Sequence, residues 1–175
     1  MNTEKSIFKS DKLRYALLFA SDKSSLSLPF GYSAADGIVA PSVKNSFGSY
    51  RDTARSRTTV KPDEVKAYSS YQSACENIDK ADLHSVNILA VQNRDEEIGE
   101  SLSGILQQWQ AKLGFYCSIS YVSESEYDEK ISGGDYTLAL TRINGEYNRP
   151  EAYLGMFTSG GYKYSAMDDA YSALI

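Results

Sequence analysis

The feature that most constrains the fold of this chain is an alternation of apolar patterns between residues 86 and 142. Val86–Val91 is a short apolar run rich in β-branched residues, which is typical of a buried strand. Residues 98–113 then carry apolar side chains at helical spacing, and Gly114 is well suited to end that helix in the left-handed conformation. Residues 115–121 alternate as a half-buried strand does, and residues 136–142 supply a third strand.

A capping box lies between the second and third predicted strands. Ser123 and Glu126 have the spacing that opens a helix, which we expect to continue through Tyr127 and to stop at the glycine pair 133–134. Strand, helix, strand, helix, strand with short connections indicates right-handed crossovers. The sequence therefore predicts an α/β fold with a mostly parallel or mixed sheet flanked by helices. Ligands bind outside the carboxyl ends of such strands, which here means the loops after Val91, Val122 and Arg142.

The first half of the chain predicts two helices separated by a long loop. Apolar residues at helical spacing follow Asp11, and a second helix should start with Pro62 at its first position and run to about Ile78. Residues 24–59 are rich in Ser, Gly, Ala and Pro and are expected to be mostly loop. At 175 residues, the chain suits one domain spanning residues 1–175.

Composition argues against several function classes. A net charge of -5 opposes binding to nucleic acid, and no apolar run approaches the roughly 20 residues that span a bilayer. The single histidine, His84, leaves too few ligands for a zinc site, so neither a metal nor a cofactor is expected. Cys75 falls on the apolar stripe of a helix with no orienting partner for catalysis, so no enzyme activity is expected. It and Cys117 are expected to be buried and reduced.

Several short motifs occur in an order that points to one family. Residues 145–154 read Gly-Glu-Tyr-Asn-Arg-Pro-Glu-Ala-Tyr-Leu, and residues 8–23 place Arg14 and Ala16 in a helix that ends in Ala-Ser-Asp-Lys. Residues 107–114 lead through Leu-Gly into a strand, and residues 133–136 read Gly-Gly-Asp-Tyr. A loop at residues 36–41, and Tyr162 or Tyr164 with Asp168, complete the series. Together they resemble the oligopeptide and dipeptide solute-binding proteins of ABC importers, family 5.

The resemblance implies one lobe of a bilobal, periplasmic-binding-protein-like fold. The family has a long first lobe before the Arg-Ala helix, so the chain is expected to be an excised C-terminal lobe. The signal peptide and the lipid-anchor cysteine would then belong to the missing N-terminal part. The expected full-length protein is a monomeric, lipid-anchored, extracytoplasmic receptor in the periplasm or at the cell surface. It would deliver a peptide or another small solute to ABC permease subunits.

The resemblance also implies where the ligand binds. Glu146 matches the acidic residue that sits in the family's cleft and can hold the α-amino group of a peptide. The other ligand-binding residues expected from the same segment are Arg142, Asn144, Tyr147 and Tyr153. A second interpretation is that Glu146 is a solvated loop carboxylate paired with Arg149, which would contribute at most about 1 kcal/mol. Residues 141–144 would offer a strand edge to the peptide main chain.

Three other functions stay open from the sequence. Relatives on the same fold bind nickel chelates, haem, opines or sugars. A ligand-sensing lobe of a transcriptional regulator is a second alternative, and an unrelated α/β interaction domain is a third.

Overall fold

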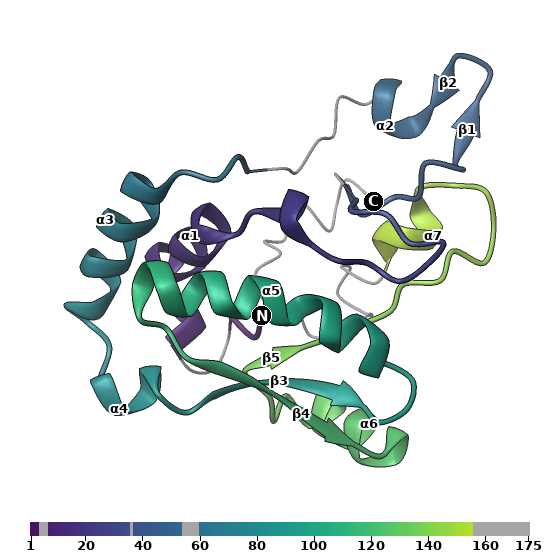
Figure 1. Ribbon diagram of the computed structural model, residues 1–175. Helices are drawn as coiled ribbons and strands as arrows, with labels where there is room; N and C mark the ends of the chain where they lie inside the picture. The colour runs from purple at the N-terminus through teal and green to yellow at the C-terminus, as the bar shows by residue number, and fades with distance from the viewer. Residues whose placement is uncertain (4–6, 36, 54–59, 156–175) are drawn as a thin grey trace. The chain divides into compact units, whose positions relative to one another are not determined.

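The computed structural model describes residues 1–3, 7–35, 37–53 and 60–155 (Figure 1). The chain forms two compact units, which are described separately below. Unit 1 comprises residues 1–34 and 60–140, and unit 2 comprises residues 35–59 and 141–175. The expectation of a single domain over residues 1–175 stays a prediction.

Unit 1 contains a parallel three-stranded sheet in the order β4-β3-β5. Its strands are β3 (Val86–Val91), β4 (Cys117–Val122) and β5 (Leu138–Ala139), and β3 pairs in parallel with both neighbours. The crossover helices are α5 (Glu96–Leu113) and α6 (Glu124–Gly133). This confirms the predicted α/β class. The third strand is shorter than the predicted residues 136–142, because the chain leaves the sheet after Leu140.

Helices cover both faces of this sheet, α5 on one and α6 on the other (Figure 1). Alternation along β3 explains the two layers, since neighbouring side chains of a strand point to opposite faces. Ile88 belongs to the main apolar cluster together with Trp109 of α5. Leu89 belongs to a second cluster with Tyr127 and Ile131 of α6.

Two further helices pack against each other beside α5. They are α1 (Asp11–Ala20), whose N-cap Ser10 accepts a hydrogen bond from the Leu13 amide, and α3 (Glu64–Cys75). Asp63 caps α3, so Pro62 precedes the cap and does not occupy the first helical position that the sequence suggested. Among the short elements that were not predicted are the 3-10 helix η1 (Ile7–Lys9) and the helix α4 (Lys80–Leu83).

Regular structure is sparse in the described part of residues 24–59, as predicted. The described part of this stretch holds a hairpin of β1 (Lys44–Asn45) and β2 (Gly48–Ser49), followed by α2 (Tyr50–Thr53). A 3-10 turn, η2 (Lys23–Ser25), precedes it in unit 1. Within unit 2, the side-chain oxygen of Asn148 accepts a hydrogen bond from the Lys44 amide at 3.3 Å, which ties the hairpin to the segment before α7 (Glu151–Leu154).

Both cysteines are free thiols and are partly buried. Burial raises the pKa of the Cys117 thiol to about 12. Among the described residues, no helix is long and apolar enough to cross a membrane.

Candidate functional site

Polar side chains gather where the parallel strands of unit 1 end. Asp95 follows β3 and is fully buried, and its carboxylate accepts hydrogen bonds from the Val91 amide at 2.9 Å and from two nitrogens of Arg94 at 3.1 and 3.2 Å. A buried carboxylate is tolerated only when it is paired and hydrogen-bonded, and Asp95 meets both conditions. The loop after β3 is therefore fixed to the end of its own strand.

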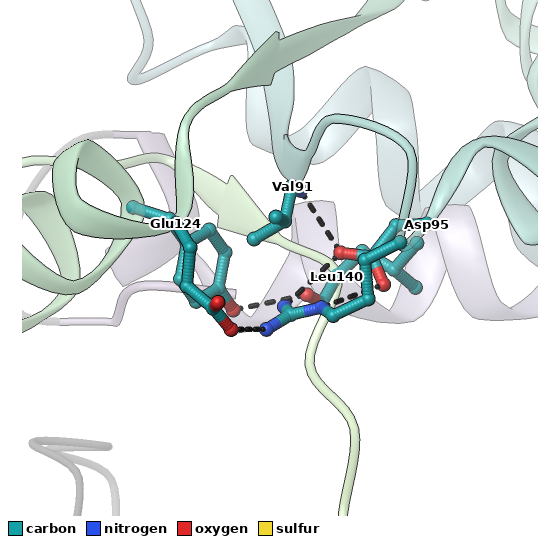
Figure 2. A network of polar contacts seen from close by, with 6 residues as sticks. Val91, Asp95, Glu124 and Leu140 are labelled. Atoms are coloured by element: carbon teal, nitrogen blue, oxygen red, sulfur yellow. Dashed lines mark hydrogen bonds and ion pairs between the residues drawn. The ribbon is translucent and has the colours of Figure 1, made fainter.

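The same network reaches the ends of β4 and β5 (Figure 2). A third nitrogen of Arg94 lies 3.0 Å from Glu124, the first residue after the cap that follows β4. The guanidinium carbon lies 5.2 Å from the ring centre of Tyr127, whose hydroxyl donates to the Leu140 carbonyl oxygen at 2.9 Å. The hydrogen bonds to Asp95, and then the pair with Glu124, raise the pKa of Arg94, so the guanidinium stays charged.

Local backbone geometry at this loop departs from the usual pattern. Asn93 has a φ of 62°, the only positive φ of a non-glycine residue in the described part of the chain. Asp95 stands at the N-cap position of α5 but makes no side-chain bond to the helix, although N-cap aspartates usually bond to the first-turn amides. Sequence reasoning placed the loops after Val91 and Val122 near a site but did not identify this network. In the sequence, Asp95 directly precedes the predicted helix and therefore looks like an ordinary N-cap residue.

Unit 2 contains all five residues that the sequence predicted for ligand binding. Arg142, Asn144, Glu146 and Tyr147 are exposed, and Tyr153 is partly buried. Residues 141–145 form no helix or strand. The expected strand edge at residues 141–144 is therefore an irregular segment outside the sheet.

The turn between this segment and α7 brings Tyr153 back toward Gly145. The Arg149 amide donates to the Tyr147 carbonyl at 2.9 Å, and the Tyr153 amide donates to the Pro150 carbonyl at 3.0 Å. A Cβ added at Gly145 would lie 2.2 Å from Cζ of Tyr153, so only glycine leaves room for the ring there. The Tyr153 ring therefore lies against the residue that precedes Glu146.

The carboxylate of Glu146 is exposed, and within the described residues no ion pair joins it to Arg149. The paired interpretation of Glu146 thus has no support in this structure. A cavity of about 410 Å³ lies elsewhere, on the face of the sheet beside α6, where Asn87, Ser120 and Lys130 contribute to its lining. None of the five predicted residues lines it.

Comparison with known protein families gives one match that covers most of the chain. The model of the bacterial extracellular solute-binding proteins, family 5 (middle part), matches residues 1–165. The chain belongs to this family. The members of this family are described as bacterial extracellular solute-binding proteins. The comparison with curated proteins found no match.

Solved structures share the fold of this family 5 protein. The peptide-binding pheromone receptor PrgZ aligns with a TM-score of 0.76 and 22% identity over 93% of this chain and 34% of its own. The substrate-binding domain of an oligopeptide ABC transporter from Bacillus anthracis gives 0.75 and 23% over 97% and 33%. Peptide-bound OppA from Listeria monocytogenes gives 0.71 and 16% over 90% and 31%. The chain thus spans about a third of each of these three structures, which fits part of a bilobal protein.

Proposed function

We propose that this family 5 protein binds peptides with a free N-terminus for an ABC importer, and that Glu146 holds the α-amino group. The observation that carries the proposal is the exposed carboxylate of Glu146 within a segment whose acidic-Tyr-x-x-Pro pattern led to the family. The structural relatives described as peptide receptors support the ligand class.

The chemistry of Glu146 suits an ammonium ligand. A carboxylate that accepts hydrogen bonds from an ammonium group makes charge-assisted bonds, which are roughly twice as strong as neutral ones. Closure of the site around the ligand excludes water and strengthens such a bond further. Because Arg149 does not neutralise Glu146 in this structure, a ligand would not have to displace an internal cation from it.

The neighbouring residues have complementary roles in the proposal. Tyr147 has an exposed fraction of 53% and presents an aromatic face to the first side chain of the ligand. Asn144 offers an amide to the peptide main chain, and Arg142 offers a cation to carboxylates of the ligand. Tyr153 forms the wall behind Glu146 through its packing against Gly145.

The proposed transport cycle needs more than this chain. A second lobe closes on the ligand by a hinge motion, and the closed receptor delivers the peptide to permease subunits. We further propose that the complete protein is a monomer that a lipid holds at the outer face of the cell membrane. No chemistry on the peptide is part of the proposal.

Calorimetric titration of the full-length protein with a pool of tri- to pentapeptides tests this function. The same peptides with acetylated N-termini, and the Glu146→Gln variant, are titrated in parallel. Glu151→Gln is the matched control, because Glu151 is also an exposed glutamate of this segment. Binding that is lost on acetylation and in Glu146→Gln, but kept in Glu151→Gln, is the expected result.

Two outcomes would contradict parts of the proposal. Peptide binding that ignores both acetylation and Glu146→Gln would remove the amine-anchor role. No peptide binding at all would move the ligand to another solute class, and nickel chelates, haem, opines and sugars are then titrated against the same protein.

A further inference from the structure

The strand β4 forms an open edge of the sheet in unit 1 (Figure 1). The Gln92 amide donates to the Val122 carbonyl at 2.9 Å, which fixes the side of β4 that bonds to β3. Successive residues of a strand point their N–H and C=O groups to opposite sides, so the even-numbered residues of β4 face β3. The backbone groups of Cys117, Ile119 and Tyr121 therefore point outward. In the part of the chain that the structure describes, no hydrogen bond joins them to another residue.

The sequence of this edge lacks the features that keep edge strands from pairing. Natural proteins protect such edges with charged side chains, proline, bulges or very short strands. Residues 115–122 read Phe-Tyr-Cys-Ser-Ile-Ser-Tyr-Val and contain no charged residue, proline or glycine. The opposite edge strand, β5, has only two residues and is protected by its length. The edge of β4 is thus a surface on which a further strand can pair.

A cavity lies on each face of the sheet beside β4. The cavity of about 410 Å³ on the α6 face is lined by Ser120 and Val122 of this strand. A second cavity, of about 370 Å³, is lined by Cys117 of β4 and by Ser103 and Leu106 of α5. Because successive side chains of a strand point to opposite faces, a strand added to β4 would direct alternate side chains to the two cavities. Peptides that extend a sheet are recognised in this way, by main-chain bonds and by pockets for alternate side chains.

The two faces beside this edge differ in charge. Residues 124–135, which comprise α6 and the turn after it, contain five carboxylates and one lysine. In the first cavity, Lys130 lies 3.7 Å from Glu126 and 3.8 Å from Asp135. Both distances exceed hydrogen-bond length, so one ammonium loosely neutralises two carboxylates. The α5 side chains that line the second cavity are uncharged. The α6 side of the edge is therefore acidic, and the α5 side is neutral.

We infer that β4 is a docking edge for an extended basic segment of another protein. The segment adds a fourth strand to the sheet, places Lys or Arg side chains near Glu126 and Asp135, and places uncharged side chains in the cavity beside α5. The acidic helix selects a basic partner, because opposite potentials across an interface favour association and like charges oppose it. This docking edge lies wholly in unit 1 and is independent of the ligand proposed for Glu146.

The test titrates the full-length protein with an octapeptide that alternates Lys and Val and is acetylated and amidated at its ends. Acetylation removes the amino group that the proposed Glu146 site would hold, so the two sites are probed separately. One control peptide has Glu in place of each Lys. Two others carry N-methyl groups on every Lys or on every Val, because only one of these sets donates to β4 for a given strand direction. Affinity is measured by calorimetry, and amide hydrogen exchange by NMR.

The Lys-Val peptide is expected to bind and to slow exchange of the amides of Cys117, Ile119 and Tyr121. One of the two N-methylated peptides should bind at least about tenfold more weakly, because it loses several main-chain hydrogen bonds, while the other keeps its affinity. The Glu-Val peptide should not bind, because its carboxylates meet the acidic side of the edge.

A pair of variants tests the charge of the first cavity. Glu126→Gln should weaken binding of the Lys-Val peptide about two- to fivefold, the size of one exposed ion pair. Asp128→Asn is the matched control, because Asp128 is an exposed carboxylate of the same helix that does not line the cavity. It should leave the affinity unchanged.

Several outcomes would overturn the inference. They are no binding of the Lys-Val peptide, equal binding of the Lys-Val and Glu-Val peptides, and unchanged exchange at the three outward amides. Protection of those amides without any peptide would also overturn it. Protection that grows with protein concentration would assign the edge to a second copy, and constant protection would assign it to a strand of the same protein. None of these outcomes bears on the amine anchor, because the peptides are acetylated.

Discussion

The indole Nε1 of Trp109 lies 3.1 Å from the carbonyl oxygen of Leu17, a residue 92 positions earlier in the chain. The same N–H lies 2.8 Å from Oγ of Ser21, just past the end of α1. The Trp109 ring also packs edge-on against Phe115, at 6.0 Å between ring centres. Trp109 thus joins α1 to α5 by both polar and apolar contacts.

Replacement of Trp109 by Phe should destabilise the protein by about 1–3 kcal/mol. The change removes the donor to Leu17 and leaves a buried carbonyl without that partner, and it also leaves a small void. Urea unfolding followed by circular dichroism measures the difference. Tyr116→Phe, at an exposed position, serves as the control and should stay within about 0.5 kcal/mol of the wild type. Equal stabilities of the two variants would contradict the anchoring role of Trp109.

Gly145→Ala should distort the proposed ligand-binding segment. Its Cβ would overlap the Tyr153 ring, and relief of such an overlap costs about 1–3 kcal/mol. Gly104→Ala is the matched control, because a Cβ at this helical position meets nothing within 4 Å, and alanine there should stabilise the protein by up to about 1 kcal/mol. Thermal unfolding of the two variants should therefore shift in opposite directions. A shift of Gly145→Ala to higher temperature would show that Tyr153 does not lie against Gly145.

Ser123→Ala should lower stability by about 1 kcal/mol, because the Ser123 hydroxyl accepts from the Glu126 amide at the start of α6. Ser125→Ala changes the same residue type two positions further along, on the exposed surface of the helix, where alanine has the higher helix propensity. Denaturant midpoints of the two variants should move in opposite senses. A midpoint of Ser123→Ala equal to that of the wild type would rule out the cap.

Alkaline pH should destabilise the protein through Cys117. The folded state raises the pKa of this thiol by burial from 9.0 to about 12. Above about pH 9 the unfolded chain releases the proton while the folded chain keeps it, so the free energy of unfolding falls as the pH rises toward 12. Tyr71, with a pKa raised to about 12 by burial and by Cys75, adds to the slope above pH 10.

Urea unfolding at pH 7, 8, 9 and 10 measures this dependence. The variant Cys117→Ala should show a shallower decline between pH 9 and 10 than the wild type, with no difference in slope below pH 8. Identical slopes for the two proteins between pH 9 and 10 would contradict a partly buried Cys117 that stays protonated in the folded state.

The sequence was informative wherever one residue decides a local structure. Gly114 ends α5 in the left-handed conformation with a φ of 67°, as predicted from its place after the apolar stripe. Ser123 caps α6, as its spacing from Glu126 indicated. The parallel sheet followed from the order of the elements. These features depend on a few neighbouring residues or on chain topology, and both can be read from a sequence.

Features that depend on groups distant in the chain were not predicted. The pattern of residues 136–142 contains no sign that β5 ends at Ala139, where Tyr127 bonds to the Leu140 carbonyl and Asp95 to the Val91 amide. From the sequence alone, Asp95 looks like a helix cap. In the structure its side chain is buried, and its carboxylate accepts a hydrogen bond from the Val91 amide instead. The roles of Glu146 and its neighbours rest on the family pattern and stay predictions.

Asn2 binds the segment that leads into β5, and this has a consequence for the order of folding. Its amide donates to the Thr137 carbonyl, and its side-chain nitrogen donates to the carbonyls of Gly134 and Tyr136, 132 and 134 positions away. During synthesis on the ribosome, none of these bonds can form until residue 134 has emerged. Contacts of such high sequence separation slow folding. We therefore expect α1 and α3 to associate first and the sheet to close last, with Asn2 among the last residues to reach its final place.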